Sequence, residues 1–504
     1  MITIGKRYEI QDRTILQKIA RGNMLLRGLR PDFSAECLQE LGQIHGPAKA
    51  NGAPNVRDLR DLLWASIDND DSEDLDQLTA AEPLPGGFTR IRVAVADVDS
   101  LVRKDSAIDR QAQANTTSVY TAAQIFPMLP PKLSTNLTSL NLGQDRLAVV
   151  VEMTIDPDGS VVESAVCRAV VRNHAKLAYN SVAAWLEGRA PVPGAAAEVA
   201  GLAESLQLQD TVAQRMRRLR HSQGALSLET IEARPVFRGE EIIDLLVEET
   251  NRAKQIIEDF MIAANAVTAR YLEERGIPSL RRVVRAPRRW DRIVHIAAEH
   301  GFRLPRSPDS KKLETFLTMM KKSDPRRFPD LSLAVIKLLG NGEYVAEMPG
   351  EDSGGHFGLA IKDYTHSTAP NRRYPDLITQ RLLKAALENR PTPYSPKALS
   401  LLAEECTRKE DIVAKVERQV NKSAAALLLQ SRIGERFSAM VTGSAEKGTW
   451  VRLLDVPVEG MLKLKGEGEG IDVGDQITVE LASVDVMLGF IDFKLCSQCQ
   501  EVRQ

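Results

Sequence analysis

Six carboxylates lie within nine consecutive positions of one short segment, which reads ASIDNDDSEDLDQL at residues 65–78. They are Asp68, Asp70, Asp71, Glu73, Asp74 and Asp76. Apolar runs flank the segment, at residues 62–67 and in IRVAVADV at 91–98, so a folded chain would draw these charges toward its interior. Charges of one sign that cannot all reach water need a counter-ion. Oxygen ligands without His or Cys nearby suit Mg²⁺ or Mn²⁺, so the segment is a candidate metal site, with a solvated acidic loop as the alternative.

Size and charge limit what can surround this segment. The chain has 504 residues, enough for about three domains, and its 66 basic and 68 acidic side chains give a net charge of −2. That balance excludes a generally basic nucleic-acid-binding coat and leaves only local patches for such a role. No apolar run approaches the roughly 18 residues of a membrane span. Five scattered cysteines, and a start (MITIGKRYEI) without a signal peptide, predict a protein of the reducing cytoplasm with no membrane partner.

Residues 1–60 predict a small helical module, with short helices over 13–21, 34–44 and 56–62. Three short helices broken by Gly and Pro fit either a winged helix-turn-helix or a plain helical cap on the next domain. The first interpretation would make the chain a DNA-binding regulator, although its candidate recognition helix, SAECLQELGQI, is acidic.

The body of the chain, residues 61–430, predicts an α+β domain in which strands come first and helices later. LAVVVEMTI at 147–155 and SVVESAVCRAVV at 160–171 have the composition of paired strands. Apolar residues at three- and four-residue spacing predict helices over 242–274, 290–300, 312–320, 331–339 and 400–429, and another from Tyr374 onward. Residues 431–504 form the last predicted domain. Its sequence after Gly434 predicts five short strands with glycine between them, the pattern of a small five-stranded OB barrel.

Six segments follow one another in a characteristic order. They are IDNDDSEDLDQ, VAVADVDSLVRKDSAIDRQAQANTTSVY, FPMLPPKLSTNLTSLNLGQDRLAVVVEM, AKLAYNSVAAWLEG, IEDFMIAAN and HFGLAIKDYTHSTAPNRRYPDL. Together they closely resemble the RNB catalytic domain of the ribonuclease II family of exoribonucleases, over about residues 62–430. The C-terminal barrel resembles the OB-fold RNA-binding domain named after ribosomal protein S-one. The two cold-shock barrels that commonly precede the catalytic domain do not fit into about 60 residues, so the N-terminal module departs from the family pattern.

The resemblance implies a catalytic domain of mixed sheets and packed helices around a central channel. It implies processive 3′-to-5′ hydrolysis of single-stranded RNA, with release of 5′-mononucleotides by a two-metal mechanism that uses Mg²⁺, or Mn²⁺ in its place. Single-stranded RNA is the implied partner, and we expect a monomer.

The resemblance also assigns metal ligands and catalytic residues. Asp68, Asp74 and Asp76 match three of the four aspartates of the family's acidic motif, and with Arg372 they are the implied catalytic residues. The fourth position is Gln77, whose amide oxygen can still bind a metal but removes one negative charge. The main alternative is a catalytically weakened RNA-binding protein of the same fold, and Gln77 is the only feature that favours it.

Substrate contacts follow from the same resemblance. Arg372 matches the arginine of the family's SPIR-type motif, here APNRR, and Arg373 lies beside it. Two cations at a helix N-terminus oppose the macrodipole, which indicates an anionic partner or ordinary surface arginines. Tyr120 in SVY and Tyr179 in AKLAYN match aromatic residues that pack on bases, and Glu417 in VERQV matches a carboxylate near the terminal nucleotide.

Overall fold

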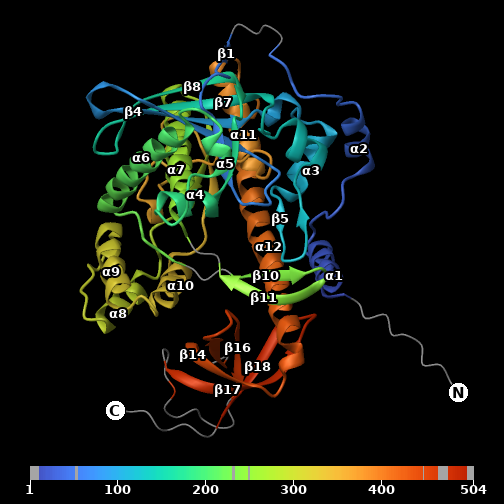
Figure 1. Ribbon diagram of the computed structural model, residues 1–504, viewed down its shortest axis with the longest axis vertical. Coiled ribbons are helices and arrows are strands. Elements are labelled where there is room, and N and C mark those ends of the chain that lie inside the picture. Colours follow the sequence, from blue (N-terminus) through green and yellow to red (C-terminus); the bar gives the residue numbers. More distant parts are fainter. Residues whose placement is uncertain are drawn as a thin grey trace, which may run out of the picture.

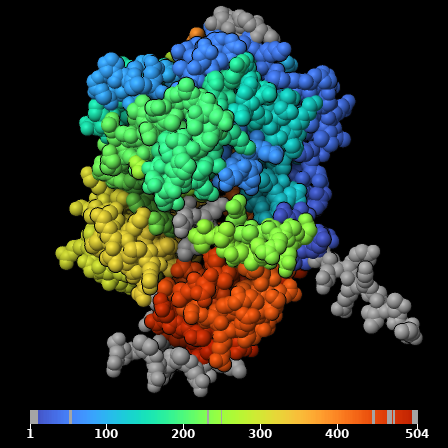
Figure 2. Space-filling model, in the orientation of Figure 1, coloured from blue at the N-terminus to red at the C-terminus, as the bar shows by residue number. Residues whose placement is uncertain are grey.

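The computed structural model describes residues 11–50, 55–229, 233–247, 250–445, 448–463, 471 and 475–496 (Figure 1). It shows an α+β body and a small β barrel, and one long helix, α12 (Pro396–Leu429), runs from the body to the barrel. Figure 2 shows the barrel below the body, with the hairpin of β10 (Ala233–Arg238) and β11 (Glu241–Val247) between them. The α+β class expected from the sequence is confirmed.

A seven-stranded sheet in the order β1-β8-β7-β4-β3-β2-β9 forms the centre of the body. Its strands are β1 (Val56–Asp58), β2 (Ala65–Asp68), β3 (Gln77–Pro83), β4 (Thr89–Ala96), β7 (Asp145–Ile155), β8 (Val161–Arg172) and β9 (Ala175–Ala178). β7 and β8 pair antiparallel, as their sequences predict, whereas β1 and β9 pair in parallel with β8 and β2. The acidic segment is the connection between β2 and β3, so it lies where two neighbouring strands of this sheet end and begin.

Helices pack against the sheet and share its apolar core. The helices of the body are α1 (Asp12–Leu26), α2 (Ala35–Gly42), α3 (Ala107–Asn115), α4 (Tyr179–Leu186), α5 (Gly194–Ala197), α6 (Leu202–Gln223), α7 (Arg252–Glu274), α8 (Trp290–Glu299), α9 (Ser310–Ser323), α10 (Phe328–Leu339) and α11 (Tyr374–Leu387). Short strand pairs complete it: β5 (Val119–Tyr120) with β6 (Ile125–Phe126), and β12 (Ser279–Val283) with β13 (Glu343–Glu347). Among the described residues, no helix is long and apolar enough to cross a membrane.

The C-terminal strands close into a five-stranded barrel, as predicted. They are β14 (Arg436–Ala445), β15 (Gly448–Leu453), β16 (Glu459–Lys463), β17 (Gln476–Asp485) and β18 (Phe490–Leu495), in the order β14-β15-β16-β18-β17. Phe437, Val479 and Phe493 fill the interior, and Ala426 and Leu429 of α12 belong to the same apolar cluster. The barrel is therefore packed onto the end of α12 and is not merely tethered to it.

Two sequence predictions of helix were wrong. Residues 56–58 form β1, because they pair with β8 at the edge of the sheet. The expected helix over 242–274 begins only at Arg252, because the segment before it is strand β11, which turns back on β10 at Gly239 with a φ of 64°. Asn251 then caps α7, its side chain accepting a hydrogen bond from the backbone N–H of Lys254. Apolar spacing alone does not separate such a strand from a helix.

The N-terminal helices have no apolar core of their own. Leu16, Ile19 and Ala20 of α1 pack against Val416 and Val420 of α12 and join a cluster that also includes strands β5 and β6. In the described residues α1 thus packs as a cap on the body, and the choice between the two interpretations stays a prediction. The domain boundaries 1–60, 61–430 and 431–504 stay a prediction.

Buried ion pairs fix α11, the helix that follows Arg372 and Arg373. Arg381 is 3% exposed, and its guanidinium lies 3.0 Å from a carboxylate oxygen of Asp99 and 2.8 Å from one of Asp109. Lys384 contacts Asp97 and Asp99, both at 2.8 Å. Removing one partner of such a network leaves an uncompensated buried charge.

We therefore expect Arg381→Met to lower the free energy of unfolding by about 3–5 kcal/mol. Urea denaturation of the full chain measures it. Arg390→Met is the control: its ion pair with Glu388 is more than half exposed on the arginine side (57%), so the change should stay within about 1 kcal/mol. Equal losses in the two variants would show that the α11 network does not stabilise the body.

Candidate active site

Asp76 is the most enclosed carboxylate of the acidic segment, with 2% of its surface exposed. Its Oδ1 accepts a hydrogen bond of 2.9 Å from the backbone N–H of Asn371. Its Oδ2 is buried and lies 3.3 Å from Nε of Arg372, but no group of the described residues donates a hydrogen bond to it. Burial raises the pKa of Asp76 to about 7 despite the nearby Arg372 cation, and the charge of Asp74 adds to the rise.

Asp74 interacts electrostatically with Asp76 and with Asp68. Burial raises the pKa of Asp74, and Asp68 raises it further while Arg372 opposes the rise. The Tyr120 hydroxyl lies 3.5 Å from Oδ2 of Asp74, a long hydrogen bond. Asp68, at the end of β2, accepts 2.9 Å hydrogen bonds from the Ser72 hydroxyl and from the next backbone N–H. That Asp68, Asp74 and Asp76 act together as one ligand set stays a prediction.

The rest of the acidic segment lies outside this group. Asp70, Asp71 and Glu73 are exposed, in agreement with a solvated loop for that part. Gln77 is the first residue of β3, pairs with Val95 and is half-buried, and its side chain forms no hydrogen bond with a described residue. The segment thus divides into an exposed tip and a buried end at Asp76.

The loop that carries Arg372 is tied to the segment before Tyr120. The carbonyl oxygen of Arg372 accepts hydrogen bonds from the Ser118 N–H at 2.9 Å and from the Thr117 hydroxyl at 3.0 Å. Its side chain is 40% exposed, so one edge of the guanidinium faces Asp76 and the rest can reach a ligand. Arg372 is therefore held at its backbone and left free at its side chain.

Both candidate stacking residues lie beside the carboxylates. Tyr179 begins α4 directly after β9, and the register of β9 with β2 places Ala178 opposite Asp68. Tyr120 is 39% exposed, and its backbone N–H donates a 2.8 Å hydrogen bond to Glu417 on α12. Burial raises the pKa of both tyrosine hydroxyls, so both stay protonated at neutral pH.

Arg373 faces the interior of the fold. Its guanidinium donates a 2.8 Å hydrogen bond to Asp376 of α11, and the Asp376 side chain is fully buried. This ion pair explains how an arginine is tolerated at the N-terminus of α11, since a carboxylate in the first turn offsets it. The assignment of Arg373 to the substrate stays a prediction.

Sequence reasoning missed the part that Asn371 plays. Its backbone N–H fixes Asp76, and its side chain is fully buried within 2.6 Å of the Thr138 hydroxyl. The residue lies inside APNRR, directly before Arg372, so the motif itself contained the signal. However, any residue except proline can donate this backbone hydrogen bond, so the residue type at position 371 does not predict it.

The chemistry of the donors fits a hard divalent cation. The three aspartates offer only oxygen, and the free buried Oδ2 of Asp76 is the kind of atom that a cation would satisfy. Among the described residues, no three His, Cys, Asp or Glu side chains come together closely enough to form a ligand set by themselves. The fit therefore rests on the donor type and on the open oxygen of Asp76.

The raised pKa of Asp76 has a consequence for stability without divalent ions. An unfolded Asp titrates near 3.9, so between about pH 4 and pH 7 the folded state binds this proton more tightly and stability falls as pH rises. In chelator, Asp76→Asn should therefore raise the free energy of unfolding at pH 8 by on the order of 2 kcal/mol, with little difference near pH 4. Urea unfolding at both pH values tests this, and a variant less stable than wild type at pH 8 would contradict it.

Comparison with known proteins places this geometry in a family. Residues 56–389 match the RNB domain, and residues 435–495 match the RNase II-type exonuclease C-terminal S1 domain. Ribonuclease R of Thermotoga maritima is 28% identical over 504 residues, covering 93% of this chain and 69% of the relative. Ribonuclease R of Escherichia coli is 30% identical over 474 residues, covering 87% of this chain and 57% of the relative. The chain thus spans between just over half and about two thirds of the length of these relatives.

Solved structures show the same fold. Mycoplasma genitalium RNase R in complex with ribose-methylated single-stranded RNA superposes with a TM-score of 0.86 at 23% identity, covering 95% of this chain and 78% of that one. Yeast Ssd1, described as a pseudonuclease, has a TM-score of 0.70 at 18% identity, covering 88% of this chain and 55% of that one. Because the fold hosts both kinds of protein, activity has to be argued from the site. The chain belongs to the RNB-domain family of the ribonuclease II exoribonucleases.

Proposed function

We propose that the chain hydrolyses single-stranded RNA from its 3′ end and releases 5′-mononucleotides. The observation that supports this is the buried Asp76, whose Oδ2 has no hydrogen bond from a described residue and lies 3.3 Å from Arg372, with Asp74 acting on it and Asp68 acting on Asp74. Hydrolysis of a phosphodiester builds negative charge on its oxygens, and an arginine beside a set of cation-binding carboxylates is suited to that charge.

Asp68, Asp74 and Asp76 would hold Mg²⁺, with Mn²⁺ as the alternative, and Gln77 would add a neutral oxygen. When bound, two such ions supply charge neutralisation for the phosphate and a coordinated water of lowered pKa. Arg372 would donate to the phosphate through the exposed part of its side chain, in a planar geometry that Lys does not reproduce.

The tyrosines support a preference for single strands of any sequence. Every base has a face on which Tyr120 or Tyr179 can stack, and such stacking contributes about 1–3 kcal/mol per base. Glu417 holds the backbone of Tyr120 from α12, so in this structure it positions an aromatic residue. Several such contacts along a strand would keep the RNA bound between successive cleavages, which is the physical basis of the processivity that we propose.

The weakened RNA-binding alternative rests on Gln77 alone and is not favoured, because Asp68, Asp74, Asp76 and Arg372 are all present. A monomer in the cytoplasm remains our expectation from the sequence.

The direct test uses single-stranded RNA labelled at either end. With Mg²⁺, 3′-labelled RNA should release its label at once as 5′-mononucleotide. The 5′-labelled RNA should be found only at full length or as a short end product, without fragments of intermediate length. Chelator should stop both reactions. Internal cleavage products, or label released first from the 5′ end, would overturn the proposal.

We expect Asp76→Asn to abolish release of mononucleotides while RNA affinity, measured by fluorescence anisotropy, stays within about twofold. The reason is that the substitution removes a metal ligand and not the stacking surface. Asp70→Asn is the matched control, since Asp70 lies in the same segment but is exposed, and it should keep near-normal activity. Continued release of mononucleotides by Asp76→Asn would contradict the assignment of Asp76 as a metal ligand.

Gln77→Asp should lower the Mg²⁺ concentration at half-maximal rate by a few-fold, on the order of tenfold at most, because it adds a negative charge next to Asp76. A metal titration of the initial rate measures this. An unchanged midpoint would place Gln77 outside the metal's ligand shell.

A further inference from the structure

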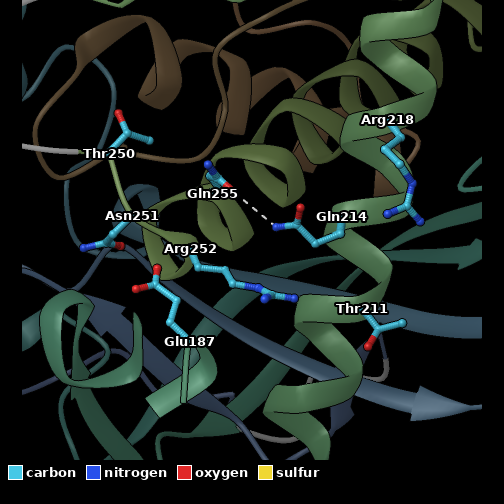
Figure 3. Close-up of a pocket in the computed structure, with 8 residues that line it drawn as sticks. All are labelled: Glu187, Thr211, Gln214, Arg218, Thr250, Asn251, Arg252 and Gln255. Atoms are coloured by element: carbon cyan, nitrogen blue, oxygen red, sulfur yellow. Dashed lines mark hydrogen bonds between the residues drawn. The ribbon is translucent and has the colours of Figure 1, made fainter. Parts of the chain in front are cut away.

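A polar pocket of about 430 Å³ lies between α4, α6 and α7, apart from the acidic segment (Figure 3). All its lining residues are polar: Glu187, Thr211, Gln214, Arg218, Thr250, Asn251, Arg252 and Gln255. Thr211, Gln214 and Arg218 share one face of α6, and Asn251, Arg252 and Gln255 belong to the first turn of α7 or its cap. Its volume lies in the range of small-molecule sites, and its lining suits a polar ligand.

One positive charge in the pocket is uncompensated. The guanidinium of Arg252 is held by Asp210 through two hydrogen bonds of 2.8 and 2.7 Å, and Glu187 is paired with Arg189. Arg218 is exposed and forms no hydrogen bond or ion pair with any residue that the structure describes. The carboxylate of Glu187 interacts with the backbone of Arg252 and so offsets the positive end of α7, which leaves Arg218 as the unpaired charge.

The polar groups divide the pocket into two sides. In Figure 3, Arg218 lies on the α6 side, whereas Glu187 and Asn251 lie on the other side, with the paired amides of Gln214 and Gln255 between them. An anionic group would favour the Arg218 side. The carboxylate of Glu187 can accept hydrogen bonds from hydroxyl groups, whereas the Asn251 amide is already engaged with Lys254 and Asn180. A phosphate ester with a hydroxylated body matches both sides.

Helix α4 runs between the candidate active site and the pocket. Helix α4 begins with Tyr179 and ends just before Glu187, a span of eight residues and roughly 12 Å. Asn180, the neighbour of Tyr179, accepts a 3.3 Å hydrogen bond from the side chain of Asn251. Tyr179 and Glu187 thus lie at opposite ends of α4, and the pocket is about one short helix away from the candidate active site.

We propose that the pocket binds a nucleoside 5′-monophosphate, with its phosphate at Arg218 and its ribose toward Glu187. The choice of this phosphate ester rests on the proposed function, because that reaction releases 5′-mononucleotides beside Tyr179. The site is then a second position for the product on its way out.

Calorimetric titration of the full chain with uridine 5′-monophosphate in chelator tests the proposal without any turnover. Arg218→Ala should weaken binding by roughly tenfold, the loss expected for one charged hydrogen bond, and Arg218→Lys should retain most of the affinity. Arg103→Ala is the matched control, because Arg103 is also exposed, forms no side-chain bond with a described residue and lies outside the pocket. Uridine without phosphate, and inorganic phosphate alone, should each bind more weakly than the monophosphate.

Absence of binding, equal affinity in Arg218→Ala and wild type, or inorganic phosphate binding as tightly as the monophosphate would each overturn the proposal. The labelled-RNA assay keeps the two proposals separate. Mononucleotide release without binding in the pocket would refute only the proposal that the pocket binds a nucleoside monophosphate. Binding that depends on Arg218 in a chain that does not degrade RNA would refute the proposed reaction and leave the pocket standing.

Discussion

The burial of one carboxylate, Asp76, is the constraint on which the site depends. A carboxylate removed from water is stable only if it is protonated, paired or bound to a cation. Here one oxygen has the Asn371 N–H and the other has only Arg372, in contact at 3.3 Å without a hydrogen bond. The fold therefore keeps a partly unsatisfied carboxyl group in its interior, and the proposed cation would satisfy it.

The groups around Asp76 come from distant parts of the chain. The acidic segment joins β2 to β3, the Arg372 loop precedes α11, and the Tyr120 strand is fixed by Glu417 of α12. Helix α1 packs against both α12 and the β5–β6 pair, so this N-terminal cap supports the element that presents Tyr120. This cap contributes to the site indirectly, through packing.

The sequence predicted those features that depend on residue type and short-range pattern. The acidic segment, the paired strands β7 and β8, helix α12 and the five-stranded barrel all have strong local signals. The sequence did not predict secondary structure correctly where pairing with a distant strand determines it. Residues 56–58 become a strand only because β8 offers an edge, and 242–247 become one because Gly239 closes a hairpin. Arg373 also illustrates the limit, since only the fold shows that Asp376 neutralises it.

Binding of a divalent ion at Asp76 is the central claim, and titration of Mn²⁺ followed by electron paramagnetic resonance tests it most directly. The full chain should bind Mn²⁺ at this site, Mg²⁺ should displace it, and Asp76→Asn should lose it while Asp70→Asn retains it. Mn²⁺ binding that is absent from the wild-type chain, or that survives unchanged in Asp76→Asn, would contradict the account.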